Sequence, residues 1–593
     1  MSAVVNHPNL SSDKIEARAF QLKALDSILS SSTLLVLPTG SGKTPIEFMA
    51  IAEKLAENPS KKALLIAPTN PLLSQHFNDA NMILNIPTES IVMVNGGINW
   101  EKRAEMMKNA KLVLATPQVI RNDVIRGSIN LTDYCFLVID EAHHATGKHA
   151  MSQVAELYLK DSDGESILGA TASPGSTEKA IVNLSEKLNI KNIFSMERSN
   201  PLISRYTSEL ESKFIILELP LKIIQLAEPL KKWLDEMVGK LQRMGVYLHK
   251  GVITTAGLND AMRRSQFLID RKSQHGWNSI KLAADSIRVL QIINLLTTQG
   301  IASTRNYMRR TINQYEKGEK KLSRIIQRKE FINLKNEIFD MQEIHNKIQK
   351  VRELVLEQLE INAKSRIIVF ASLRDSVRSI SIALNGINQI NSVPFIGQSS
   401  REGDDGMSQK KQMSTLNEFR NGKLNVLVAT SVGEEGLDIP SADRVIFFEP
   451  VASEIRTIQR RGRTGRYRDG FVFVLISKDT KDEGIRFASA AKERRMHKTL
   501  NRVKYQRKLY FRELGNSDLL KRFIITKNDE KISAKEFIES EERILRKNKI
   551  TSEKNFNDTT EDSNISVPTN NHSLSQKLRP KGQSSLEDFE NIK

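Results

Sequence analysis

A short stretch near the N-terminus carries the residue types that bind phosphate groups. The turn Gly40–Thr44, with the sequence Gly-Ser-Gly-Lys-Thr, follows an apolar run and leads into a helical pattern of apolar residues. Gly40 and Gly42 allow a tight turn whose backbone N–H groups point inward at phosphate oxygens. Lys43 would then reach the β- and γ-phosphates of a nucleotide, and the Thr44 hydroxyl would hold magnesium. The nucleotide contacts expected here are Pro38, Thr39, Gly40, Ser41, Gly42, Lys43 and Thr44.

The turn is only half of the phosphate-loop motif, because the full motif has glycine where this chain has Leu37. Taken alone, it could equally be an ordinary glycine-rich turn before a helix. The acidic partner of such a loop is present at Asp140 and Glu141, directly after an apolar run. Asp140 would bind magnesium through water, and Glu141 would take a proton from the water that attacks the γ-phosphorus. His143 either connects this pair to residues 171–173 or caps a helix.

These residues follow short apolar runs that we interpret as strands of one buried parallel sheet. Strands that are apolar on both faces belong to parallel sheets covered by helices, and binding sites form at the carboxyl ends of such strands. The runs end in polar loops and are separated by helical patterns; they lie at 62–71, 110–118, 136–144 and 166–174. Their polar loops are therefore expected at the same sheet edge as the phosphate loop.

A second alternating pattern of strands and helices follows further along the chain. Its predicted strands are 366–370, 393–396, 424–429, 444–448 and 471–476. Two of its loops, 430–440 and 459–466, have residues that could do chemistry. Arg463 and Arg466 are three residues apart on a predicted helix, so they project from one face and could reach the γ-phosphate across a cleft. A basic helix for nucleic acid would explain their charge, but not the glycine spacing around them.

Length and composition indicate a globular chain of several units. The 593 residues suggest about four of them. No apolar run approaches the ~20 residues of a membrane span, and residues 1–13 lack the pattern of a secretory signal. The single cysteine, Cys135, lies in an apolar run, so neither an internal disulfide nor cysteine-ligated zinc is expected. We therefore expect a cytoplasmic protein without a membrane partner.

Positive charge is concentrated in two segments of the chain. The net charge is +18, and residues 222–350 hold 24 basic against 12 acidic residues, while residues 492–549 hold 18 against 9. Residues 221–345 show long amphipathic patterns and no strand-like run, which predicts a helical insert. Such charge fits contact with a nucleic-acid backbone, although solvated helix faces are the alternative. The basic residues expected along a DNA backbone are Arg309, Arg310, Lys320 and Lys321.

The motifs, taken in order, resemble those of superfamily 2 helicases. They are Gly-Ser-Gly-Lys-Thr, Ala-Pro-Thr, Thr-Pro-Gln, Asp-Glu-Ala-His, Thr-Ala-Ser, the loop 430–440 and Gln-Arg-Arg-Gly-Arg-Thr-Gly-Arg, within about residues 15 to 480. A half-formed phosphate loop is itself typical of that group. Within it, residues 37–44, 67–72 and 395–398, together with the helical insert, look most like the Hef/FANCM/Mph family.

This resemblance implies roles for further residues. Arg18 and Gln21, on adjacent turns of a predicted helix, would contact adenine; Gln459 would contact the γ-phosphate and Asp438 the ribose. The threonines that would touch the nucleic-acid backbone are Thr69, Thr116 and Thr430. The family's insert grips branched or duplex DNA. Archaeal Hef proteins often continue into a nuclease, whose motif is not found here, so a helicase-only archaeal Hef is the form we expect.

We predict an α/β fold with two RecA-like parallel-sheet lobes at 1–220 and 346–490. An all-α insert occupies 221–345, a basic helical extension 491–550 and a disordered tail 551–593. The predicted function is an ATP- and Mg²⁺-dependent DNA helicase or translocase that acts on forked or branched DNA at the nucleoid. Two alternatives stay open. A double-stranded-RNA translocase of the Dicer or antiviral-sensor type shares every motor motif, and a fork-binding scaffold could have lost catalysis.

The last residues hold a candidate partner motif. Residues 551–582 are rich in Asn, Ser and Thr, which predicts a flexible tether. Gln583, Leu586 and Phe589 then fit one helical turn that resembles the PCNA-interacting box, although Glu590 replaces its usual second aromatic residue. The alternative is a disordered tail whose few apolar residues have no role. A separate structure-specific nuclease is the other partner we expect.

Overall fold

The computed structural model describes residues 3–38, 40–161, 166–197, 199–206, 212–398, 406–430, 442–450, 471–509 and 518–561. The chain divides into two units, Met1–Ile538 and Glu539–Lys593, and the features below belong to the first, apart from α20 (Ala534–Glu561), most of which lies in the second.

The first lobe is a seven-stranded parallel sheet with the strand order β4-β5-β3-β6-β7-β2-β8. Its strands are β2 (Thr33–Val36), β3 (Lys62–Ile66), β4 (Ile91–Val94), β5 (Leu112–Ala115), β6 (Tyr134–Asp140), β7 (Ser166–Thr171) and β8 (Asn192–Ser195). The strands are buried nearly throughout, as their unbroken apolar runs predict.

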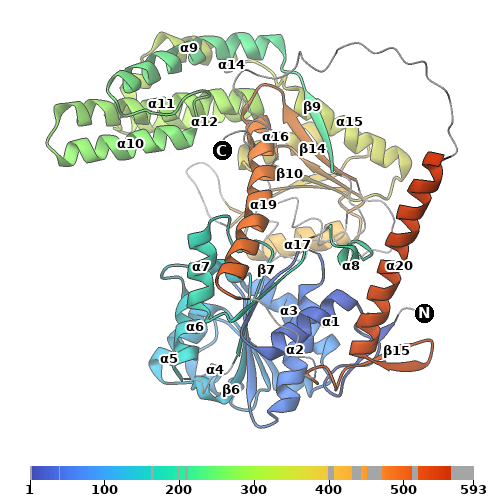
Figure 1. Cartoon of the computed structure of the whole chain (residues 1–593). Coiled ribbons are helices and arrows are strands. Elements are labelled where there is room, and N and C mark those ends of the chain that lie inside the picture. Colours follow the sequence, from blue (N-terminus) through green and yellow to red (C-terminus); the bar gives the residue numbers. More distant parts are fainter. Residues whose placement is uncertain are drawn as a thin grey trace, which may run out of the picture. The chain divides into compact units, whose positions relative to one another are not determined.

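Helices cover both faces of this sheet (Figure 1). The helices are α1 (Ala19–Ser30), α2 (Lys43–Glu57), α3 (Asn70–Ile83), α4 (Trp100–Lys108), α5 (Pro117–Arg126), α6 (Ala150–Asp161), α7 (Glu178–Lys187) and α8 (Pro201–Ser204). Alternate strand residues such as Leu64 and Ile66 share a core with α5, α6 and α7. Helices α1, α2 and α3 pack beside one another on the opposite face.

The second lobe is a six-stranded parallel sheet with the order β11-β12-β10-β13-β14-β9. Its strands are β9 (Ser212–Leu217), β10 (Ile367–Phe370), β11 (Ser392–Phe395), β12 (Val426–Ala429), β13 (Arg444–Phe447) and β14 (Phe471–Ser477), and its helices include α15 (Asn346–Ile361), α16 (Arg374–Asn385) and α17 (Gln409–Arg420). Two parallel-sheet lobes confirm the predicted fold class. Strand β9 precedes the insert in sequence but pairs with β14, so the second lobe holds a strand from the range predicted for the first.

The insert is an all-α domain with a core of its own (Figure 1). It comprises α9 (Leu221–Arg243), α10 (Thr255–Asp270), α11 (Gln274–Thr298), α12 (Ile301–Glu316), α13 (Ser323–Ile326) and α14 (Lys329–Ile338). Buried side chains such as Leu230, Leu296 and Phe331 fill this core. The insert is therefore a packed body that can hold a surface in a fixed shape.

The segment after the second lobe returns to the first. Helix α19 (Lys481–Gln506) begins after β14, and its residues Leu500 and Val503 belong to the first-lobe core. The range predicted to be a helical extension also contains a hairpin of β15 (Ile524–Lys527) and β16 (Glu530–Ser533), followed by α20 (Ala534–Glu561). The last residues of α20, from 551 to 561, are helical although the sequence predicted a disordered tail there. Asn528 and Asp529 both have positive φ, as a two-residue hairpin turn requires. The N-terminal strand β1 (Val4–Asn6) pairs with β15.

Candidate active site

The phosphate loop lies between β2 and α2 and is braced by α1. Gly40 and Gly42 have φ of 78° and 81°, the left-handed region that favours glycine. The buried Gln21 amide donates to the Gly42 carbonyl oxygen over 3.1 Å, and a Cβ on Gly42 would lie 2.5 Å from the Gln21 Nε2. Gln21, predicted to contact adenine, therefore supports the loop in this structure.

Lys43 opens helix α2 with its side chain turned back over the loop. Its ammonium group is buried and donates to the carbonyl oxygen of Leu37 over 3.3 Å. Ser41 Oγ donates to the Pro38 carbonyl oxygen over 2.7 Å. The lysine charge is thus held within the turn that would surround a phosphate group.

The acidic pair stands at the carboxyl end of β6, against which α2 packs. The Glu141 N–H donates to Asp140 Oδ1 over 2.8 Å, and Glu141 itself has φ of 51°, a left-handed conformation that is costly for a residue other than glycine. Its carboxylate lies 3.3 Å from His143 Nδ1, which lies 3.1 Å from Thr171 Oγ1. His143 therefore connects the acidic pair with the loop after β7, the first of its two predicted roles.

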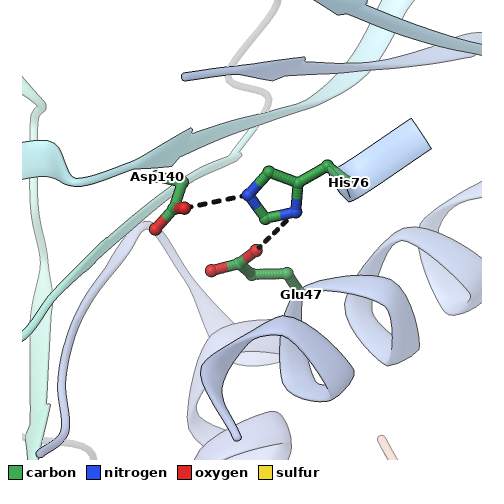
Figure 2. A group of neighbouring side chains, drawn as sticks. All are labelled: Glu47, His76 and Asp140. Carbon is green, nitrogen blue, oxygen red and sulfur yellow. Dashed lines mark hydrogen bonds and ion pairs between the residues drawn. The ribbon is translucent and has the colours of Figure 1, made fainter. Parts of the chain in front are cut away.

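Two residues outside the sequence motifs stand behind Asp140: His76 contacts its carboxylate, and Glu47 lies on the other side of the His76 ring (Figure 2). His76 on α3 donates from Nε2 to Asp140 Oδ2 over 2.9 Å, and its Nδ1 lies 4.0 Å from Glu47 Oε2 on α2. All three side chains are buried. Burial opposes protonation of His76, but the hydrogen bond and the charges of Asp140, Glu47 and Asp79 outweigh it and raise the pKa of His76.

Among the residues that the structure describes, Glu47, His76 and Asp140 form the one group of ligand atoms close enough to hold a metal ion, within 4.8 Å of one another. Mg²⁺ takes oxygen ligands, and the His76 nitrogen that faces Asp140 is engaged in a hydrogen bond. The three residues together therefore do not suit magnesium; instead His76 orients the Asp140 carboxylate, an oxygen ligand of the kind that magnesium takes.

The predicted backbone-binding threonines all follow the carboxyl ends of strands. Thr69 comes after β3, Thr116 after β5 and Thr430 directly after β12. The Oγ1 atoms of Thr69 and Thr430 are covered by protein and make no hydrogen bond within the described residues. Neither hydroxyl is therefore open to solvent in this structure.

Three of the four basic residues predicted to follow DNA, Arg309, Arg310 and Lys321, have protein partners of their own. Arg310 pairs over 2.8 Å with Asp375 of α16 in the second lobe. The Arg309 guanidinium lies 5.8 Å from the centre of the Phe339 ring, and Lys321 lies 3.1 Å from Glu319. Arg310 therefore contributes to the contact between the insert and the second lobe.

That contact is centred on the C-terminal end of α11. The Gln299 amide donates to Glu449 Oε2 over 2.6 Å and accepts from Ser376 Oγ over 2.6 Å, with all three residues buried. The fully buried Lys347 donates to Asp482 over 2.5 Å and to the Thr298 carbonyl oxygen over 3.2 Å. We call these five side chains the anchor; breaking such a pair would leave a buried charge uncompensated.

Several predicted site residues lie outside the described part of the chain. These are Thr39, Asp438, Gln459, Arg463, Arg466, Gln583, Leu586 and Phe589. In that described part, no helix is long and apolar enough to cross a membrane.

Two parallel-sheet lobes, a phosphate loop and an acidic strand end define a helicase core. Family models agree: the DEAD/DEAH box helicase model matches residues 18–181, and the helicase conserved C-terminal domain matches residues 346–468. The crystal structure of the Pyrococcus furiosus Hef helicase domain is similar over its whole length and over 81% of this chain, with 33% identity and a TM-score of 0.64. The chain belongs to the family of this Hef helicase domain.

Curated relatives match over most of this chain but less of their own length. A protein of Methanocaldococcus jannaschii that bears the name of an ATP-dependent RNA helicase is 36% identical over 84% of this chain and 63% of its own length. The ATP-dependent DNA helicase mph1 of Neurospora crassa is 30% identical over 79% of this chain and 41% of its own length. The chain thus spans less than two thirds of either relative.

Proposed function

We propose that the protein is an ATP-dependent DNA helicase or translocase that acts on branched or forked DNA. The observation that carries this proposal is the likeness to the entire Hef helicase domain, in a chain that has both an ATP site and a basic helical insert. As its substrate is DNA, we place its work at the nucleoid in the cytoplasm.

ATP would bind at the phosphate loop, with its β- and γ-phosphates beside Lys43. Magnesium, held by Thr44 and through water by Asp140, would neutralise part of the phosphate charge. Glu141 is the proposed base for the attacking water. Gln459, Arg463 and Arg466 of the second lobe would complete the site when the lobes close.

The anchor would couple ATP hydrolysis to movement of the DNA-binding insert. Gln299 joins the insert to Glu449 of the second lobe, and Lys347, at the start of α15, binds both the Thr298 carbonyl oxygen of the insert and Asp482 at the start of α19. Closure of the lobes on ATP would therefore carry the insert with the second lobe. The motor would grip DNA by its backbone, so we expect weak sequence preference and strong preference for branched structures.

A double-stranded-RNA substrate is the second candidate, because the names of the two relatives above differ between RNA and DNA helicase. The test compares ATP hydrolysis with forked DNA, plain duplex DNA and double-stranded RNA, and ATP-dependent remodelling of fork, Holliday-junction and duplex substrates. Stimulation by forked DNA supports the proposal, and stimulation by RNA alone overturns it. Binding to forked DNA without any ATP hydrolysis would leave the scaffold alternative.

Two protein partners complete the proposal. Gln583, Leu586 and Phe589 would dock on the sliding clamp PCNA, with residues 551–582, which begin with the end of α20, as a tether that raises the concentration of the motor at replicating DNA. A separate structure-specific nuclease would cut the junctions that the motor remodels, because remodelling leaves strand breakage to another enzyme.

A further inference from the structure

The turn between α10 and α11 presents two aromatic side chains to solvent. Phe267 lies one turn before the end of α10 and is 55% exposed, and Trp277 lies in the first turn of α11 and is 58% exposed. The two helices run side by side (Figure 1). The guanidinium group of Arg271, in the connecting turn, lies 4.2 Å from the centre of the Phe267 ring. We call Phe267, Arg271 and Trp277 the tip.

The tip has a fixed backbone. A Cβ on Gly276 would lie 2.7 Å from the Ile269 backbone nitrogen and 3.0 Å from the Leu268 carbonyl carbon, so the two helices approach too closely for another residue. Lys272 takes the left-handed conformation, with φ of 60°, that reverses the chain. The backbone that carries the two aromatic rings is therefore fixed, while the rings themselves stay exposed to solvent.

The surroundings of the tip are basic. Residues 254–281 contain five Lys and Arg residues against two Asp residues. Asp260 already pairs with His249 and Arg263, and Asp270 accepts from the Gln266 amide over 3.0 Å. Exposed aromatic rings within basic surroundings are the combination that binds unpaired nucleic acid, because bases stack on the rings while cations contact the backbone.

We propose that the tip stacks on bases that are unpaired at the branch point of forked DNA. This inference rests on the proposed function. Within an intact duplex each base is already stacked on its neighbours, so Phe267 and Trp277 gain contacts only where strands separate. Phosphate contacts elsewhere on the insert bind any duplex. The tip would thus supply the preference for branches.

The first test measures affinity of the full chain for a fork and for a blunt duplex of equal length, by fluorescence anisotropy at several salt concentrations. A Phe267→Leu, Trp277→Leu pair keeps apolar bulk but loses the aromatic faces; a Phe267→Tyr, Trp277→Phe pair keeps them. We expect the leucine pair to lose about ten-fold in fork affinity, with duplex affinity and salt slope unchanged. The aromatic pair should bind forks like the parent. Parental fork affinity in the leucine pair would overturn the proposal and assign the rings to another partner.

A second test detects the stacking itself. The chain has three tryptophans, of which Trp233 is buried, so a Trp100→Phe background leaves Trp277 as the solvent-facing reporter. We expect its fluorescence to be quenched by a fork and not by a blunt duplex. Equal signals with both would contradict the proposal.

The matched control is Phe487→Leu. Phe487, on α19, is 67% exposed and has an arginine, Arg486, near its ring, so it tests the loss of an exposed aromatic residue elsewhere. We expect parental fork affinity. If DNA stimulates ATP hydrolysis by the parent protein and the leucine pair still binds forks with parental affinity, only the tip proposal fails. If DNA does not stimulate ATP hydrolysis by the parent protein, the proposed function fails.

Discussion

At the scale of single residues, the proposed ATP site combines the ammonium group of Lys43 with the carboxylate of Glu141, the proposed general base. Lys43→Ala should abolish ATP hydrolysis, because the β- and γ-phosphates lose their buried counter-charge. Glu141→Gln should still bind ATP but hydrolyse it at least ~100-fold more slowly, the usual contribution of a general base. Binding of a fluorescent ATP analogue and DNA-stimulated phosphate release measure the two effects. Normal hydrolysis by the Glu141 variant would assign the base to another residue.

His76 has a testable role through Asp140. Without the hydrogen bond from His76 Nε2, the Asp140 carboxylate loses the group that fixes its orientation. His76→Ala should raise the Mg²⁺ concentration for half-maximal ATPase activity by about 10-fold or more, the usual cost of removing a group behind a metal ligand. His76→Gln, which keeps a donor, should restore part of it. An unchanged Mg²⁺ dependence in a folded His76→Ala protein would show that His76 only packs.

The sequence predicts the outer residues of this site better than its interior. Lys43, Asp140 and Glu141 belong to short motifs, each contained in a single loop, so the sequence alone shows which residues lie together. His76 enters from a different helix, and helical periodicity says only that its position is buried. Glu47 could have been found from the sequence, because it is an acidic residue within the apolar run 46–52 and lies on the same helix face as Lys43.

At the scale of elements, the start of α15 depends on a neutral histidine. His345 Nδ1 accepts from the Lys347 N–H over 3.2 Å, while Nε2 donates to the Thr297 carbonyl oxygen over 3.0 Å. A protonated imidazole cannot accept, so it would lose the contact that caps the helix. Burial, and then the nearby charge of Lys347, lowers the pKa of His345 to about 4.

Stability should therefore fall with acidity in a defined window. The unfolded chain binds the proton at its ordinary pKa near 6.5 and the folded chain only near 4, so stability is complete above 6.5 and is lost as the pH falls towards 4. By pH 5 the loss should be about 2 kcal/mol. Urea unfolding followed by tryptophan fluorescence measures it. His345→Asn, which can cap without titrating, should remove this part of the pH dependence; an unchanged dependence would contradict the assignment.

The sequence predicts which segments are strands better than it predicts which strands pair with one another. Unbroken apolar runs predicted parallel strands, and both sheets confirm it. The run containing β9 has the same character, yet nothing local tells whether it joins the sheet before or after the insert. The β15–β16 hairpin was predicted as helix because its charged residues concealed the turn at Asn528 and Asp529, whose φ values only the structure reveals.

At the scale of the whole molecule, a segment near the N-terminus and a segment after the second lobe meet on the first lobe. The His7 ring stacks on Phe523 with centres 4.5 Å apart, and Glu53 binds both His7 and Arg522. Phe523→Ala should lower the stability of this lobe by about 3–5 kcal/mol, because a fully buried ring is removed. Ile524→Ala, at the adjacent and exposed first position of β15, is the control and should change it by less than about 0.5 kcal/mol. Equal thermal shifts in both variants would contradict this role.

The far C-terminus should act apart from the motor. A peptide of residues 579–593 should bind the sliding clamp of the same organism, because Leu586 and Phe589 would fill an apolar pocket and Gln583 a polar one. Calorimetry measures the affinity. A Leu586→Ala, Phe589→Ala peptide is the control, and equal binding by both peptides, or none at high micromolar concentration, would remove the clamp as a partner.

Helix α11 connects the anchor to the tip. The end near Gln299 is fastened to the second lobe, and the other end carries Trp277. Its 25 residues make a rod about 37 Å long. A rod held at one end works as a lever: each degree that the second lobe turns about the anchored end would move the tip by about 0.6 Å. A turn of about 6° would then move the aromatic rings through about 3.5 Å, close to the ~3.4 Å rise of one base pair.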